Sequence, residues 1–311
     1  MENHERSADT AVIGAGLTGA WIASALRSAG IDVLVLDKGR GPGGRLSLRR
    51  SDCGSFAHGC PLEAIATWAG TLPADALQAR GLAPAMDIRD PRLQALPRHL
   101  LADLRTRYEA QVARIERGDS GWRLFDASGG VIAEARRLVL TAPAPQSAAL
   151  LEDVRPDWSS RLRALPCAPA WCVLLAQPAD QPEPDWQALA PALAQVQAQD
   201  ALPGEDARRW VLQLSEAASR ERLEDSPQAL LQALLSQLGS KPSHWLHAAA
   251  HRWRYARIVE PLHEPLLLDD ALQLAVCGDA FAGGGGDSDL QRCRRSAETL
   301  LQHWLPASPR N

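Results

Sequence analysis

The segment GAGLTG, residues 14–19, is the feature that most constrains the fold. It follows the apolar run TAVIG at residues 10–14. A predicted helix over residues 17–29 begins within it, because apolar side chains there recur at the helical spacing i, i+3, i+4 and i+7. A second apolar run, residues 31–37, ends at Asp37. Strand, helix and parallel strand in this order form a crossover unit, so the sequence predicts an α/β fold with a Rossmann-type domain.

The glycine spacing in this segment is that of a cradle for dinucleotide phosphates. Gly14 permits the tight turn, Gly16 lets a pyrophosphate approach the backbone, and Gly19 lets the helix pack closely on the sheet. The N-terminus of the helix offers free N–H groups and a partial positive charge. The alternative is a tight strand–helix turn without a ligand. The predicted cofactor contacts here are Gly14, Ala15, Gly16, Leu17, Thr18 and Gly19.

Asp37 opens the loop DKGRGPGGRL, residues 37–46, and is placed to accept hydrogen bonds from the ribose of either NAD or FAD. The loop carries a second glycine pair and three basic side chains, a pattern that resembles flavoproteins of the glutathione reductase and monoamine oxidase type. Its glycines let the backbone run beside FAD, and Arg45 offsets the pyrophosphate charge. A solvated basic turn is the alternative. The predicted contacts are Asp37, Lys38, Arg40, Gly43, Gly44 and Arg45.

Composition excludes several other classes of protein. The net charge of −4 lacks the excess of positive charge that is typical of nucleic-acid-binding proteins. The six cysteines lack metal-ligand spacing, so we expect free thiols and no metal site. The N-terminal segment MENHERSADT is not a basic leader, and no other run of about 18 uncharged apolar residues occurs. We therefore expect a cytoplasmic protein without membrane contact.

The rest of the chain predicts two interleaved domains. We expect a discontinuous FAD-binding domain over residues 1–60, 96–150 and 270–311, and an α+β substrate domain over residues 61–95 and 151–269. Apolar patterning predicts helices near 62–69, 96–110, 226–238 and 288–303. It predicts three strands within 113–145 and further strands at 170–177, 208–215, 251–258 and 273–278.

Several motifs occur in the order of one family: DKGRGPGGRL, FAHGC, LVLTAPAPQSAALL, APAWCVLLA, RRWVLQLS and AHRWRYARI. Together they resemble the bacterial renalase-like FAD-dependent oxidoreductases, relatives of the amine oxidases, over nearly the whole chain. The resemblance implies non-covalent FAD and a small-molecule substrate, a 2- or 6-dihydro isomer of NAD(P). Hydride would pass to flavin N5 and the electrons to O2. Such chemistry needs a dry, planar pocket and no catalytic triad or metal.

The resemblance also implies cofactor contacts far from the first glycine motif. Val112, in EAQVARI, would bind adenine through its backbone. Gly278 and Asp279, at the end of a buried strand, would contact the ribityl and phosphate part of FAD. The last helix would begin against the isoalloxazine ring, at Leu290.

The substrate pocket has three candidate residues. Alternation along HRWRYARI puts His251, Trp253 and Tyr255 on one face of a strand and the intervening arginines on the other. Trp253 and Tyr255 either wall a pocket for a planar substrate or pack within the sheet. His58, just after the FAD loop, either contacts the pocket or caps a turn.

Two segments depart from the family pattern. Cys60-Pro61 follows His58-Gly59 where the family continues differently, and the chain has Asp289-Leu290-Gln291 where the family has a Glu-Gly-Ala type sequence. Leu290 would hinder close approach of the flavin edge. Asp287, Ser288 and Asp289 favour a helix start, but the two acids would oppose negative charge on a reduced flavin near them.

These departures leave two alternatives to an active renalase-like enzyme. The first is an FAD-binding protein with a degenerate active site and a regulatory or binding role. The second is an amine oxidase, which usually places a lysine and a water beside the flavin. Only Lys38 and Lys241 are present, so the sequence disfavours the second alternative.

Overall fold

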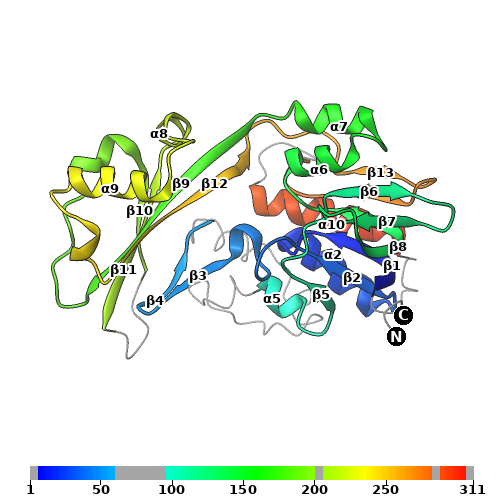
Figure 1. Cartoon of the computed structure of the whole chain (residues 1–311), viewed down its shortest axis with the longest axis horizontal. Helices are drawn as coiled ribbons and strands as arrows, with labels where there is room; N and C mark the ends of the chain where they lie inside the picture. Colours follow the sequence, from blue (N-terminus) through cyan, green and yellow to red (C-terminus); the bar gives the residue numbers. More distant parts are fainter. Residues whose placement is uncertain (1–5, 60–95, 200–205, 282–287, 306–311) are drawn as a thin grey trace. The chain divides into compact units, whose positions relative to one another are not determined.

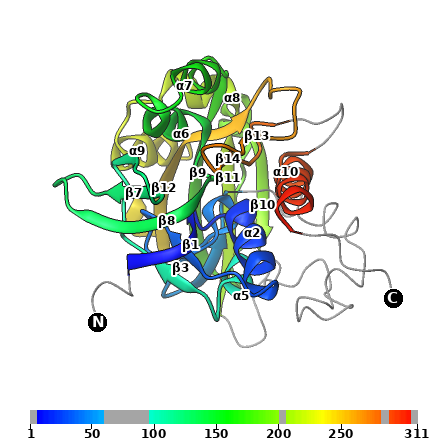
Figure 2. The same cartoon turned by 90° about the vertical axis from the view of Figure 1, so that its right-hand side faces the viewer.

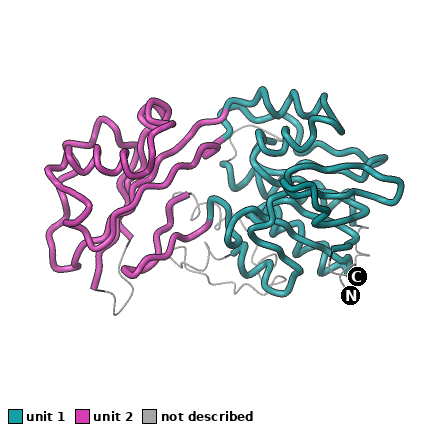
Figure 3. Tube along the Cα trace, viewed as in Figure 1, with its two compact units in different colours: residues 1–46, 62–166, 258–311 teal, residues 47–61, 167–257 magenta. Residues whose placement is uncertain are grey.

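The chain folds into two compact units (Figure 3). Our computed structural model describes residues 6–59, 96–199, 206–281 and 288–305. Unit 1 comprises residues 1–46, 62–166 and 258–311, and unit 2 comprises residues 47–61 and 167–257. The helix predicted near residues 62–69 lies outside the described residues.

A mixed sheet forms the centre of unit 1, in the strand order β13-β14-β8-β1-β2-β5 (Figure 1). Its strands are β1 (Ser7–Ile13), β2 (Val33–Leu36), β5 (Arg105–Arg107), β8 (Val131–Leu140), β13 (Leu267–Asp269) and β14 (Leu274–Val276). β1 pairs in parallel with both β2 and β8. β6 (Arg114–Arg117) and β7 (Trp122–Phe125) form an antiparallel meander with β8. The Rossmann-type α/β fold and the three strands predicted within 113–145 are thus confirmed.

Helices pack around this sheet. α2 (Leu17–Ser28) makes the crossover between β1 and β2, and α10 (Asp289–Trp304) packs along it (Figures 1 and 2). Both confirm predicted helices. α6 (Ala144–Leu151) and α7 (Pro156–Arg163) follow β8 and pack on one another. No helix in the described part of the chain is long and apolar enough to cross a membrane.

The helix predicted over residues 96–110 is wrong beyond its first turn. α5 covers only Leu96–Leu100, and β5 follows it. β5 pairs in parallel with β2, and the N–H of Asp37 donates to the carbonyl of Arg107 at 2.9 Å. Pairing with a distant strand thus overrides the local helical pattern.

Unit 2 is built on a four-stranded sheet in the order β10-β11-β9-β12. Its strands are β9 (Cys167–Pro178), β10 (Leu193–Gln199), β11 (Ala207–Leu214) and β12 (His247–Ile258). α8 (Glu216–Glu221), α9 (Pro227–Gln237) and the hairpin of β3 (Leu48–Ser51) and β4 (Gly54–Ala57) complete the unit. The strands predicted at 170–177, 208–215 and 251–258 and the helix predicted at 226–238 are confirmed.

Alternate residues of β9 are buried on opposite faces of this sheet. Trp171, Val173 and Leu175 pack in a core cluster with leucines of α9. Cys172 and Leu174 pack in a second cluster with Phe56 of the hairpin. Because both faces of the sheet are covered, the sequence of β9 is a nearly continuous apolar run and does not alternate between apolar and polar residues.

The unit boundaries differ from the predicted domain boundaries at several places, among them residues 258–269, which lie in unit 1 and not with the predicted substrate domain. The hairpin after Leu46 lies in unit 2, because Phe56 is buried against Cys172 and not against the Rossmann-type sheet. Residues 151–166 lie in unit 1, where Arg155 of the loop before α7 pairs with Asp269 of β13 at 2.6 Å.

Candidate functional site

The first glycine motif joins β1 to α2 in unit 1. Gly14 has a φ of +111°, which glycine adopts readily. A Cβ on Gly14 would lie 2.6 Å from the hydroxyl oxygen of Thr141, and one on Gly19 would lie 2.0 Å from the carbonyl oxygen of Gly14. A Cβ on Gly16 would have no heavy atom within 4 Å. Gly14 and Gly19 therefore serve packing, whereas Gly16 keeps a stretch of backbone open to a ligand.

The N-terminus of α2 carries no side-chain cap and no acid in its first turn. By contrast Ser215, Ser226 and Ser288 cap α8, α9 and α10 through their hydroxyls. The first-turn N–H groups of a helix have no intrahelical partner. The start of α2 is thus suited to bind an anion.

Asp37 is fixed at the end of β2 by the backbone on both sides. Its Oδ2 accepts from the N–H of Ala15 at 2.6 Å, and its Oδ1 accepts from the N–H of Gly39 at 2.6 Å. A carboxylate has about four acceptor positions, so each oxygen can accept a further hydrogen bond. Asp37 therefore ties its own loop to the first glycine motif and still offers acceptors to a ligand hydroxyl.

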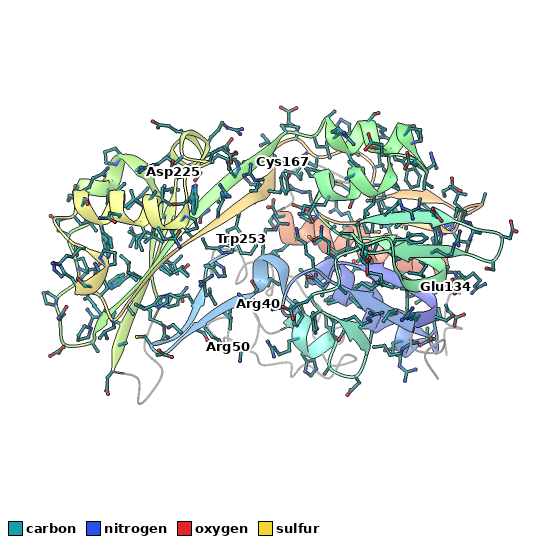
Figure 4. All side chains as sticks on the ribbon, in the orientation of Figure 1. Arg40, Arg50, Glu134, Cys167, Asp225 and Trp253 are labelled. Carbon is teal, nitrogen blue, oxygen red and sulfur yellow. The ribbon has the colours of Figure 1, made fainter. Side chains whose placement is uncertain are left out.

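The loop after Asp37 folds back onto the first glycine motif. The N–H of Gly43 donates to the carbonyl of Ala15 at 2.8 Å, and Gly43 forms a parallel bridge with Gly16. Gly43 and Gly44 have φ values of 129° and 53°, a conformation that favours glycine. Two glycine segments far apart in the sequence thus line one stretch of bare backbone. The side chains of Lys38 and Arg40 in this loop are exposed, and Figure 4 labels Arg40.

Arg45 closes this loop through a network of ion pairs. Its guanidinium lies 2.8 Å from Asp279 Oδ2 and 3.1 Å from Asp289 Oδ2. Arg292 in turn lies 2.6 Å from Asp289 Oδ1 and donates to the backbone carbonyl of Asp279 at 2.9 Å. The network joins the glycine-rich loop, the segment after β14 and the first turn of α10. Asp289 is balanced by two cations and is not a lone negative charge.

Gly278 follows β14, the last buried strand predicted. It has a φ of +144°, and a Cβ on it would have no heavy atom within 4 Å. Its N–H donates to the hydroxyl of Ser296 on α10 at 3.1 Å. The backbone at Gly278 is therefore held by the helix and, like that at Gly16, leaves open space.

Val112 and Leu290 are both buried. Val112 lies between β5 and β6, in a segment whose Glu109 donates its N–H to the carbonyl of Gly39 at 2.8 Å. This contact places the segment beside the loop that follows Asp37. Leu290 lies in the first turn of α10, which Ser288 and Gln291 cap reciprocally. The predicted helix start at Ser288 is confirmed, and Asp287 is outside the described ranges.

Unit 2 carries a cluster of aromatic rings on one face of β12. The ring centroids of His58 and His251 are 4.7 Å apart, those of His58 and Trp253 5.2 Å, and those of His251 and Trp253 4.6 Å. On the opposite face Arg254 pairs with Glu224 at 2.8 Å. The predicted alternation along β12 (Figure 4 labels Trp253) is thus confirmed, and Tyr255 is half-buried on the same strand.

The imidazoles of this cluster are neutral at neutral pH. Burial lowers the pKa of His58 to about 4; the charge of His251 adds to this effect, and the backbone of Phe56 acts in the opposite direction. Burial also lowers the pKa of His251 and of His247, and the guanidinium of Arg49 contributes to both. Within the described ranges, no group of three or more His, Cys, Asp or Glu residues could hold a metal ion.

Several residues of these two clusters were not identified from the sequence. Arg292 has a local signal, because it lies three residues after Asp289 on the same helix. Cys172 and Gln199 contact the backbone around His58 across more than a hundred residues, so no local pattern indicates them. The predicted departure at Cys60-Pro61 lies outside the described residues.

Comparison with known proteins finds similarity in the first glycine segment and in the fold. The family model of the NAD(P)-binding Rossmann-like domain matches residues 12–75. A protein of Exiguobacterium sp. 255-15 assigned as a protoporphyrinogen oxidase is similar with a TM-score of 0.60 and 15% identity, covering 96% of this chain and 98% of that one.

Two amine oxidases are also similar in structure. Cyclohexylamine oxidase from Brevibacterium oxydans IH-35A has a TM-score of 0.55 and 14% identity, over 95% of this chain and 100% of its own. Putrescine oxidase bound to putrescine has a TM-score of 0.57 and 14% identity, over 95% of this chain and 98% of its own. At these identities the similarity establishes the fold.

Proposed function

We propose that this protein is an FAD-dependent oxidoreductase that oxidises a dihydronicotinamide-type small molecule. The observation that carries the proposal is the pairing of two glycine segments, at Gly16 and Gly43, into one stretch of bare backbone beside the uncapped start of α2. A long dinucleotide with a pyrophosphate needs such a surface.

The residues of unit 1 fit FAD along its length. The start of α2 and Gly16 suit the pyrophosphate, and Asp37 offers acceptors to the adenosine ribose. The backbone beside Val112 would hold adenine. Gly278 leaves space at the other end of the site, where the ribityl chain would lie.

Arg45 has a different role in this proposal from the one its sequence position implies. Its guanidinium already faces Asp279 and Asp289. We therefore assign it first to holding the loop and α10 together. The positive charge that Arg45 would present to a bound pyrophosphate is offset by the rest of the network, which contains two arginines and two aspartates in all.

Bound FAD would supply the redox chemistry, by accepting hydride at N5 and passing the electrons to O2 as peroxide. The protein's own part is to bind a planar ring and exclude water. The aromatic face of unit 2 formed by His58, His251 and Trp253 suits the binding of a planar ring, because its rings are flat, with His58 buried and His251 and Trp253 half-buried, and its imidazoles are uncharged at neutral pH. Tyr255 extends this face along β12.

The second candidate is an amine oxidase, because two of the similar structures are oxidases of cyclohexylamine and putrescine. The lysine content argues against it. Lys38 lies exposed on the cofactor loop and Lys241 lies exposed in unit 2. The third candidate, a flavin-binding protein without turnover, is favoured by the buried Leu290 in the first turn of α10.

Anaerobic mixing tests the proposal. Purified holoprotein is mixed with 6-dihydro-NAD, putrescine or cyclohexylamine, and the visible flavin band is followed. We expect bleaching with 6-dihydro-NAD only. Bleaching with an amine alone would favour the second candidate. A flavin that no compound reduces, but that dithionite does reduce, would favour the third.

A further inference from the structure

Two buried polar side chains of α10 hold the short segment that follows β14. The hydroxyl of Ser296 accepts from the N–H of Gly278 at 3.1 Å, and Nε of Arg292 donates to the carbonyl of Asp279 at 2.9 Å. Ser296 and Arg292 are four residues apart, so they lie on one face of the helix. This face therefore fixes the two-residue segment at its first N–H and at its last carbonyl.

The hydroxyl of Ser296 also holds the end of β14. It hydrogen-bonds the thiol of Cys277, and burial raises the pKa of this thiol to about 12, so it keeps its proton at neutral pH. The N–H of Cys277 donates to the carbonyl of Leu140 on β8 at 2.9 Å. Ser296, which is only 1% exposed, thus contacts two consecutive residues where the sheet of unit 1 ends.

Arg292 is a cation that stability alone does not explain. Only 9% of its surface is exposed, and its Nη2 lies 2.6 Å from Oδ1 of Asp289. Replacing a buried ion pair by apolar residues of similar volume is often neutral for stability. What the planar guanidinium supplies is direction, because two of its nitrogens hold two partners, Asp289 and the carbonyl of Asp279, in one fixed geometry.

The segment that these side chains hold is itself bare. Gly278 has a φ of +144°, and a Cβ on it would have no heavy atom within 4 Å. A backbone that is fixed by buried side chains and carries no side chain of its own suits the close approach of a ligand.

We propose that Arg292 and Ser296 are positioning residues for the flavin half of FAD, because they fix the backbone of Gly278 and Asp279 along which the ribityl chain would lie. This inference rests on the proposed function for the identity of the cofactor. The positioning itself is a property of unit 1, to which all four residues belong. The adenosine half, which we assign to the first glycine motif, should not depend on these two side chains.

Titration of the full-length apoprotein with FAD and with ADP tests the positioning role. ADP carries the adenosine and both phosphates but no ribityl chain. In Arg292→Met and in Ser296→Ala we expect FAD affinity to fall about tenfold, as for one misplaced hydrogen bond, while ADP affinity stays within about twofold. Equal losses for FAD and ADP would show a general structural role and would overturn the inference.

Two control variants make matched changes elsewhere in unit 1. Arg294→Met removes an arginine of α10 that pairs with Glu298 at 3.4 Å and lies about 200° round the helix from Arg292. Ser159→Ala removes a buried hydroxyl that donates to the carbonyl of Ala148 at 2.7 Å. Ser159→Ala should lower the urea midpoint much as Ser296→Ala does, yet both controls should keep the FAD affinity of the natural protein.

Arg292→Lys separates charge from direction. It keeps the cation but replaces two nitrogens by one, so it cannot reproduce the geometry in which Arg292 holds Asp279 and Asp289. We expect FAD affinity to fall nearly as far as in Arg292→Met. Full FAD affinity in Arg292→Lys would mean that charge alone matters and would overturn the positioning role of Arg292.

Hydrogen exchange at the amide of Gly278, followed by NMR in the apoprotein, tests the positioning without the cofactor. The exchange rate should rise about tenfold or more in Ser296→Ala and stay unchanged in Ser159→Ala. An unchanged rate in Ser296→Ala would overturn the role of Ser296 whatever the cofactor is.

The two measurements separate the inference from the proposed function. If the natural protein binds FAD and all variants bind it equally well, the inference fails and the proposed function stands. If the natural protein binds no FAD, the proposed function fails, while hydrogen exchange still decides whether Ser296 fixes Gly278.

Discussion

Arg45 and Asp289 lie 3.1 Å apart, Nη1 to Oδ2, although 244 residues separate them in the chain. The pair joins the glycine-rich loop to the first turn of α10. With Asp279 and Arg292 it forms a network of two cations and two anions around the segments that we assign to FAD. The charge near the cofactor is thus set by the network and not by any one of its members.

Replacing Asp289 by Asn should raise the midpoint potential of the flavin. The change removes one anion and leaves both arginines, so electron uptake becomes easier. Because the carboxylate is already paired, we expect a measurable rise of up to roughly 30 mV, which for two electrons equals about 1.4 kcal/mol. Redox titration measures it, with Glu298→Gln, about two and a half turns further along α10, as control. A potential that moves equally in both variants, or in neither, contradicts this assignment.

The two glycines of the first motif should respond differently to alanine. In Gly19→Ala the new Cβ would meet the carbonyl oxygen of Gly14 at 2.0 Å, so we expect the apoprotein to lose about 1–3 kcal/mol of unfolding free energy. In Gly16→Ala the Cβ enters open space and the apoprotein should be unaffected, whereas FAD affinity should fall tenfold or more. Thermal unfolding and FAD titration of both variants check this. Equal FAD affinity in Gly16→Ala would refute the phosphate assignment.

Asp37→Ala should weaken retention of FAD. The variant loses the acceptor for a ribose and also the two backbone hydrogen bonds that hold the loop, from Ala15 and Gly39. Hydrogen bonds to charged groups contribute about 1.5–3 kcal/mol, so we expect FAD affinity to fall tenfold or more. The control is Asp32→Ala, just before the other end of β2, where the carboxylate pairs with Arg105. Equal FAD occupancy in the two variants would show that Asp37 does not contact the cofactor.

Unit 2 should lose stability in mild acid because of its buried imidazoles. The pKa of His58 in the folded protein is about 4, below its ordinary value of 6.5, so the unfolded chain takes up the proton first as pH falls. The contribution of His58 is complete above pH 6.5 and decreases between pH 6.5 and about 4, by up to about 1.4 kcal/mol per pH unit.

Urea unfolding of the apoprotein across this pH range checks the prediction. His58→Phe should flatten the pH dependence, whereas a replacement of the exposed His303, which pairs with Asp270, should not. The same slope in His58→Phe as in the natural protein would mean that His58 does not titrate abnormally.

The sequence predicted the elements whose signal is local. The glycine motif with its flanking apolar runs identified β1, α2 and β2, and the fold class follows from them. α10 was predicted to within one residue at each end, because Ser288 and Gln291 form a capping pair that can be read from the sequence. The alternation in HRWRYARI predicted which side chains of β12 share a face.

Other features depend on contacts between distant segments and have no local signal. β5 carries the sequence RTR, and only its pairing with β2 makes it a strand. The prediction for Arg45 rested on its loop alone, whereas its partners lie beyond residue 278. The fixing of His58 requires Cys172 and Gln199, whose roles appear only once β4, β9 and β10 are brought together.

The visible spectrum of the purified protein, before and after incubation with FAD and gel filtration, tests whether the two glycine segments bind FAD. We expect a yellow protein with stoichiometric FAD that heat or acid releases completely, and a matched loss of colour in Gly16→Ala. A colourless protein that takes up no added FAD would contradict it, because the paired glycine segments at Gly16 and Gly43 would then have no dinucleotide to bind.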